Sequence, residues 1–121
     1  MNVETWVYIA SHSKELAEEL SLSMEKVGFT VCSGWHKKEF LPTEKHNVPE
    51  RFSIAEEDLD DIKRCDWLVL IAGPERYSGG KFVEAGIAYG LGKKVLVRGR
   101  RENMLTYLFE SFDETLLGEP K

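Results

Sequence analysis

The apolar run at residues 66–72 constrains the fold more than any other part of this sequence. Its letters are DWLVLIA, so both alternating faces of an extended chain are apolar from Trp67 onward. A strand with two apolar faces is typical of the centre of a parallel sheet that helices cover on each side. Shorter apolar runs at 6–10 (WVYIA) and 94–97 (KVLV) predict two further strands.

Helix signals alternate with these strands. After the first strand, apolar residues recur at spacings of four, four and three at Leu16, Leu20, Met24 and Val27. The other predicted elements are a strand at 29–32 and helices at about 54–65, 82–91 and 102–109, the first of these helices opened by a capping box at Ser53 and Glu56. The sequence therefore predicts a single-domain α/β fold, a three-layer parallel sheet of Rossmann-like or flavodoxin-like type. We expect four to five strands with helices on both faces.

Length, charge and cysteine content narrow the classes of function. The 121 residues suit one domain, expected to span 1–121, and the formal net charge of −5 disfavours a nucleic-acid partner. No apolar run approaches the ~18 residues of a membrane span, and no basic signal region opens the chain. Cys32 and Cys65 form no CxxC pair, so a metal site is not expected. The expectations are a cytoplasmic protein with no cofactor, no metal and no membrane or nucleic-acid partner.

Two stretches lack regular periodicity. Residues 34–51 carry two prolines, mixed charge and two of the three histidines, and we expect a substrate loop there with His36 and His46 in solvent. Trp35 and Phe40 in this loop either stack on a planar ligand or anchor the loop to the body. A loose acidic tail is expected over 111–121.

Ligands of open parallel sheets bind outside the carboxyl ends of the strands. There the segment Ser78-Gly79-Gly80-Lys81 precedes a predicted helix, which favours a phosphate cradle because glycines let backbone N–H groups approach closely. The alternative is an ordinary turn. Glu84 follows in the first turn of that helix among small and apolar neighbours. It is either a reactive carboxylate or simply a charge that favours the helix dipole.

Three motifs together resemble the nucleoside 2-deoxyribosyltransferase superfamily, which includes base-exchanging transferases and nucleotide N-glycosidases. They are VYIAS at 7–11, DLDDI at 58–62 leading into CDWLV at 65–69, and GKFVEAGIA at 80–88 followed by KKV at 93–95. The resemblance covers roughly residues 6–108.

The resemblance implies three catalytic roles. Glu84 would be the nucleophile that attacks the anomeric carbon and expels the base, and Tyr8 would orient its carboxylate through a hydrogen bond. Asp58 would help to protonate the leaving base, with Asp61 as the alternative acid. This is the chemistry of a retaining glycosidase.

The resemblance also implies binding residues. Transferases of the superfamily have an aspartate about six positions before the nucleophile, whereas this chain has Ser78, as in the nucleotide-hydrolysing branch. Ser78, Gly79, Gly80 and Lys81 would then bind a 5′-phosphate, with Arg76 adding positive charge and Ser11 and Ser13 completing the site. Family members are homo-oligomers, dimers or larger, in which a neighbouring subunit completes the pocket. Asn103 or Thr106 would reach across, unless Asn103 is simply a helix N-terminal residue.

We therefore expect cleavage or transfer at the N-glycosidic bond of a (2′-deoxy)nucleoside 5′-monophosphate or nucleoside, through a covalent glycosyl-enzyme on Glu84. One alternative is base exchange on unphosphorylated deoxynucleosides. The other, from a different class, is a non-catalytic sensor that binds a nucleotide in the same pocket.

Overall fold

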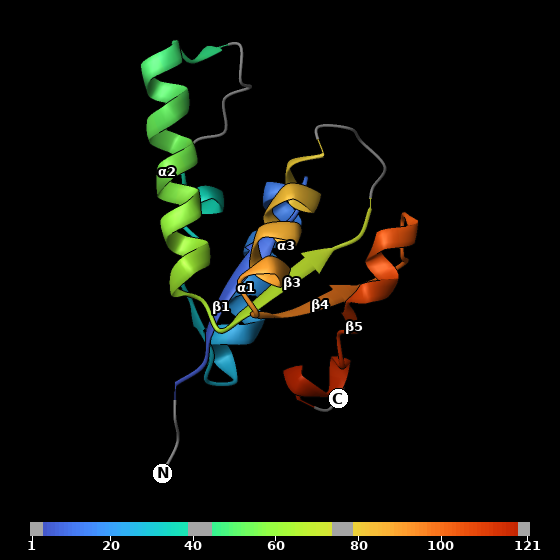
Figure 1. Cartoon of the computed structure of the whole chain (residues 1–121). Helices are drawn as coiled ribbons and strands as arrows, with labels where there is room; N and C mark the ends of the chain where they lie inside the picture. The colour runs from blue at the N-terminus through green and yellow to red at the C-terminus, as the bar shows by residue number, and fades with distance from the viewer. Residues whose placement is uncertain (1–3, 39–44, 74–78, 119–121) are drawn as a thin grey trace.

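A computed structural model describes residues 4–38, 45–73 and 79–118. Five strands form one parallel sheet in the order β2-β1-β3-β4-β5 (Figure 1). The strands are β1 (Trp6–Ala10), β2 (Thr30–Val31), β3 (Trp67–Ile71), β4 (Lys94–Arg98) and β5 (Glu110–Ser111). The most apolar run of the sequence is the central strand, and the predicted α/β fold is confirmed.

Three helices cover the two faces of this sheet: α1 (Lys14–Lys26), α2 (Val48–Arg64) and α3 (Gly80–Gly90). Along β1 the side chains alternate between the two faces, as the pleat of a strand requires. Val7 and Ile9 pack in one apolar cluster with residues of α1. Tyr8 and Ala10 pack in a second cluster with residues of α2 and α3. Both faces of the strand are therefore buried, which explains its unbroken apolar sequence.

The helix α2 begins at Val48 and not near residue 54 as predicted. Its capping box is built by Asn47, whose Oδ1 accepts a hydrogen bond from the Glu50 amide at 2.9 Å while Glu50 Oε1 accepts one from the Asn47 amide at 2.8 Å. The end of the expected 34–51 loop is therefore helical. Another part of that segment forms the short 3-10 helix η1 (Trp35–Lys37). The start of α2 extends beyond the sheet, and its apolar side chains there are exposed (Figure 1).

The expected loose tail is ordered as far as residue 118. Strand β5 pairs with β4, Phe112 is buried, and its amide donates to the Val97 carbonyl at 2.8 Å. A 3-10 helix, η4 (Glu114–Leu117), follows, and Glu114 pairs with Arg98 at 2.8 Å. One buried aromatic residue thus fixes a segment whose composition alone suggests a tail. The final residues, 119–121, lie outside the described part.

The helix expected at 102–109 is a 3-10 helix, η3 (Met104–Leu108). Only Thr106 of this segment is buried, and its four apolar side chains point outward. In the described ranges, none of the helices has the length and apolar character needed to cross a membrane.

Candidate active site

A buried tyrosine and a carboxylate form the centre of the site. Strand β1 directs Tyr8, which has 0% exposed surface, toward α3. The Tyr8 hydroxyl donates a hydrogen bond to Oε2 of Glu84, which lies on α3. Ala85 and Ala88 are fully buried on the same helix, and these small side chains allow α3 to pack closely on the sheet. The two residues expected to form a nucleophile and its orienting partner are therefore in direct contact.

Burial controls the ionisation of this pair. It raises the pKa of Glu84 to about 7, with a further rise from the charge of Asp58, whereas the hydrogen bond from Tyr8 lowers it. The pKa of Tyr8 is raised far above its usual range, chiefly by burial and then by the charge of Glu84. The phenol consequently stays protonated as a donor, while Glu84 exchanges its proton near neutral pH.

A second carboxyl group approaches from another helix. Asp58 lies on α2, which packs against both β1 and α3, and it is close enough to raise the pKa of Tyr8 and of Glu84. Its own pKa is raised to about 6, first by burial and then by the charge of Asp61, while Lys38 opposes the rise. Two carboxyl groups with raised pKa values in one partly buried site are typical of acid–base and nucleophilic chemistry.

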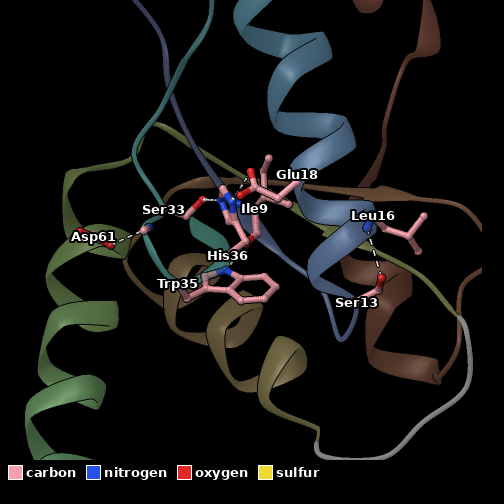
Figure 2. Close-up of polar contacts among 9 residues, drawn as sticks. Ile9, Ser13, Leu16, Glu18, Ser33, Trp35, His36 and Asp61 are labelled. Carbon is pink, nitrogen blue, oxygen red and sulfur yellow. Dashed lines mark hydrogen bonds and ion pairs between the residues drawn. The ribbon is translucent and has the colours of Figure 1, made fainter. Parts of the chain in front are cut away.

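Asp61, the alternative acid, has other hydrogen-bond partners. Its Oδ2 accepts a hydrogen bond from the Gly34 amide at 3.1 Å (Figure 2), and its Oδ1 accepts one from Arg64. Both carboxylate oxygens thus bond to neighbouring groups of the fold. Asp58 is accordingly the better placed of the two to act as an acid.

The two serines expected at a phosphate site form the start of α1. Ser13 is the N-cap, and its Oγ accepts from the Leu16 amide at 3.1 Å (Figure 2). The Ser11 Oγ accepts from the Ser13 amide at 3.0 Å. These serines directly follow β1 at the carboxyl edge of the sheet, so their placement suits a ligand there, while their oxygens already stabilise the helix terminus.

At the neighbouring strand β3, the described part of the glycine segment is the N-terminus of α3. Gly79 is the N-cap residue with a left-handed φ of 73°, a conformation that favours glycine, and Gly80 opens the helix. Among the described residues, a Cβ at either glycine would meet no atom within 4 Å. Ser78 and Arg76, the other residues expected at the phosphate, lie outside the described residues.

Lys81 lies inside the protein with an acidic partner that the sequence analysis missed. It is 4% exposed, and its Nζ donates to Glu102 Oε1 at 2.6 Å and to the Ile71 carbonyl at 3.4 Å. Glu102 Oε1 also accepts from the Gly73 amide at 2.7 Å. The ion pair therefore joins the first turn of α3 to the ends of β3 and β4. The sequence offered one indication that Glu102 pairs with a basic residue. Glu102 directly follows the basic stretch after β4.

Asn103 is the N-cap of η3. Its Oδ1 accepts from the Thr106 amide at 3.2 Å, and the Thr106 hydroxyl donates to the Asn103 carbonyl at 2.5 Å. Asn103 is therefore a helix N-terminal residue, which is the second of the two possibilities given for it above. Its contact with a neighbouring subunit stays a prediction.

His36 is fully buried, contrary to the expectation of a solvated loop residue. Its Nε2 is 2.7 Å from Ser33 Oγ and its Nδ1 is 3.2 Å from Glu18 Oε2 (Figure 2). The adjacent Trp35 donates from Nε1 to the Ile9 carbonyl at 2.7 Å, which shows the anchoring alternative for this ring. Phe40 lies outside the described residues. Among the residues that are described, no three metal-binding side chains gather into a group.

The fold occurs in solved enzymes. A 2-deoxyribosyltransferase from Bacillus psychrosaccharolyticus superposes with a TM-score of 0.77 at 22% identity, over 96% of this chain and 93% of that one. A CMP N-glycosidase, BcmB, from Clostridium botulinum gives 0.53 at 26% identity, over 78% and 71%. A 2-desoxiribosyltransferase from Leishmania mexicana gives 0.56 at 19% identity, over 88% and 72%.

No curated protein matches the chain by sequence. The family model described as nucleoside 2-deoxyribosyltransferase, however, matches residues 5–116, which include Tyr8, Asp58 and Glu84. This match confirms the resemblance and the expected class of enzyme, which acts on small nucleoside-type molecules. The chain belongs to the nucleoside 2-deoxyribosyltransferase family.

Proposed function

We propose that this protein breaks the N-glycosidic bond of a (2′-deoxy)nucleoside 5′-monophosphate or nucleoside, with Glu84 as the nucleophile. The observation that carries the proposal is the hydrogen bond from the buried Tyr8 hydroxyl to Glu84. A carboxylate attacks well only when it is ionised and aimed at the reacting carbon. The hydrogen bond from Tyr8 restricts the orientation of the Glu84 carboxylate and favours its ionised form, which supports this role.

The reaction proceeds in two displacements. A Glu84 carboxylate oxygen bonds to the anomeric carbon as the carbon–nitrogen bond breaks, and the bonding pair leaves with the base. Asp58 gives its proton to the leaving base. Water or an acceptor base then attacks the same carbon, the Glu84 ester bond breaks, and the proton of the attacking group passes to Asp58. The anomeric configuration is retained overall, as in two-carboxylate glycosidases.

The N-terminus of α3 supports the phosphorylated substrate. The amide groups of its first turn and the dipole of the helix favour an anion, and glycine at positions 79 and 80 lets an anion approach the backbone. The name of the Clostridium neighbour, a CMP N-glycosidase, agrees with this choice. Lys81 already pairs with Glu102, so we assign it a smaller share of phosphate binding than the backbone amides.

Base exchange on unphosphorylated deoxynucleosides is the second candidate. It is favoured by the names of the Bacillus and Leishmania neighbours, both deoxyribosyltransferases. This second function differs from the first in two ways: its substrate lacks the 5′-phosphate, and the group that resolves the Glu84 ester is always a second base.

The test is chromatographic detection of free base after incubation with the common nucleoside 5′-monophosphates and with the matching nucleosides. Wild-type protein and Glu84→Gln are compared, because glutamine keeps the shape and the hydrogen-bond acceptor. Base released from monophosphates by wild type alone supports the nucleotide N-glycosidase. Release from nucleosides that increases with an added acceptor base supports the transferase. Ligand binding without any release of base supports the sensor and overturns the proposal.

A further inference from the structure

Asp61 lies one helical turn after Asp58 on the same face of α2. Residues three apart in a helix are neighbours, with Cβ atoms ~5–6 Å apart. Both aspartates are partly buried, whereas Asp60 between them is exposed. The face that carries the expected acid therefore presents two carboxyl groups to the protein interior.

The position of the Asp61 carboxylate is set by its partners. Oδ2 accepts the Gly34 amide at 3.1 Å (Figure 2), and a Cβ added at Gly34 would be 3.5 Å from the same oxygen. Oδ1 is bonded by Arg64. The side chain of Asp61 is 13% exposed and that of Arg64 is 58% exposed, so solvent screens the positive charge far more than the negative one.

The turn that holds Asp61 is fixed from its other side as well. Trp35 donates to the Ile9 carbonyl at 2.7 Å, and the buried His36 bridges Ser33 and Glu18. Figure 2 shows these contacts converging on the turn from β1 and α1, opposite to Asp61 on α2. Because the Gly34 amide cannot move away freely, Asp61 stays beside Asp58.

We propose that Asp61 is a positioning residue for the reaction: its anchored negative charge favours the protonated form of Asp58, the form that can donate a proton to the leaving base. The proposal rests on the proposed function for the use of that proton. It also gives the negative charge of Asp61 a purpose, because a neutral oxygen at this place could also accept a hydrogen bond from the Gly34 amide.

Several charged groups act on Asp58, and most of them favour its protonated form. The negative charges are Asp61 and Glu57 on its own helix and Glu84 on α3, and the buried phenol Tyr8 faces it from β1. Among the described residues, the positive group is Lys38, which follows η1 and pairs with Glu57 at 2.6 Å on the surface. After burial, Asp61 is the largest cause of the raised pKa of Asp58.

The test is a carbon-13 NMR titration of the Asp58 carboxyl group in wild type, Asp61→Asn and Asp60→Asn. Asparagine keeps an oxygen for the Gly34 amide but removes the charge. We expect the pKa of Asp58 to fall by about half a unit or more in D61N. The exposed Asp60 is the matched control, and D60N should leave the pKa of Asp58 at its wild-type value.

An unchanged Asp58 pKa in D61N overturns the proposal, as does an equal fall in D60N. Should D61N fail to fold, Asp61→Ser serves in its place with the same expected direction. The titration needs no substrate, so it decides the role of Asp61 even if the wild-type protein releases no base. A wild-type protein that releases no base would contradict the proposed function and leave the role of Asp61 to be decided by the titration. Where base is released, D61N should also lower kcat/KM more at neutral and alkaline pH than at acidic pH, because less of Asp58 is then protonated, and loss of structure would not produce that pH dependence.

Discussion

At the scale of single residues, the proposed chemistry depends on how Tyr8 and Asp58 set the ionisation of Glu84. The carboxylate needs to be ionised to attack, yet burial and Asp58 raise its pKa to about 7, so only part of the protein is in the reactive form at neutral pH. The Tyr8 hydrogen bond acts in the opposite direction. Single substitutions at this pair therefore have predictable signs.

Tyr8→Phe removes the donor whose hydrogen bond lowers the pKa of Glu84. The pKa of Glu84 should rise above about 7, so the acidic limb of the kcat/KM profile should move to higher pH. Loss of a hydrogen bond to a charged group should lower kcat by about 10- to 100-fold. The measurement is a pH–rate profile beside Tyr89→Phe, a control at an exposed tyrosine of α3. Superimposable profiles for wild type and Y8F would contradict the role given to Tyr8.

Glu84→Gln should stabilise the fold at alkaline pH while abolishing turnover. The folded-state pKa of Glu84 is raised from 4.5 to about 7, so the native state binds more protons than the unfolded state within that window. Wild-type stability therefore falls as pH rises from about 4.5 to 7, and glutamine escapes this loss. We expect the free energy of unfolding, measured with urea, to be about 1–3 kcal/mol higher in E84Q than in wild type at pH 8. The difference at pH 5 should be much smaller. The exposed Glu56→Gln is the control, and equal gains at both pH values would disprove the explanation.

Sequence analysis identified this pair only through the motifs that resemble a family. The spacing of Tyr8 and Glu84 alone says nothing about contact, because 76 positions separate them. Glu102 was missed for the same reason, since it meets Lys81 only when α3 packs beside the end of β4. The order of the strands in the sheet determines which residues far apart in the chain come into contact. The types of the individual residues do not reveal that order.

At the scale of elements, the turn at Ser33–His36 joins α1, β1 and α2. The His36 side chain is shielded from solvent. Neutral imidazole fits its two partners, because Nδ1 can donate to Glu18 while the Ser33 hydroxyl donates to Nε2. Ser33 Oγ in turn accepts from the Ile9 amide at 3.1 Å. One histidine thus fixes the turn that anchors Asp61.

His36→Phe should destabilise the protein by about 1–3 kcal/mol, because it leaves the buried Ser33 hydroxyl without its acceptor. Burial lowers the pKa of His36 in the folded state, so wild-type stability should be complete above about pH 6.5 and fall below it as the unfolded chain takes up the proton. Chemical unfolding at several pH values measures both effects. Below about pH 6.5 the free energy of unfolding should depend less on pH in H36F than in wild type, because the contribution of His36 is lost. In His46→Phe that contribution should remain. A slope unchanged in H36F would contradict the assignment.

The elements themselves were predictable to different degrees. β1, β3 and β4 are continuous apolar runs, so their burial shows directly in the sequence. The start of α2 was placed too late because Pro49 suggests a loop, whereas it lies in the first turn of the helix, where proline is tolerated. The segment at 111–118 was taken for a tail because a two-residue strand and one buried phenylalanine leave no periodicity to detect.

At the scale of the whole molecule, apolar side chains gather on the surface beyond β4. Four residues of η3 are more than half exposed: Met104 at 85%, Leu105 at 70%, Tyr107 at 73% and Leu108 at 56%. Tyr89 and Leu91 at the end of α3 are also exposed, and Tyr89 contacts Phe109 next to η3. A cluster of this kind is typical of surfaces that are covered by another protein.

We predict that the chain forms a homo-oligomer, a dimer or larger, and that Leu105→Lys weakens it. Placing a charge in an apolar contact should lower the association constant by at least about 10-fold. Light scattering during size-exclusion chromatography measures the mass directly. Leu22→Lys, at an exposed leucine of α1, is the control and should leave the mass unchanged. A wild-type protein that elutes as a monomer at all concentrations would disprove this prediction.

The most direct test of the central claim is to look for the sugar on Glu84. Wild-type protein is mixed with a substrate from which it releases base, and the reaction is quenched in acid within one turnover. The protein is then digested, and the mass of the peptide that contains Glu84 is measured by mass spectrometry. We expect this peptide to gain the mass of the glycosyl group in wild type and in Asp60→Asn, but not in Glu84→Gln, which should also release no base. Release of base by E84Q at the wild-type rate, with no modified peptide, would contradict the account.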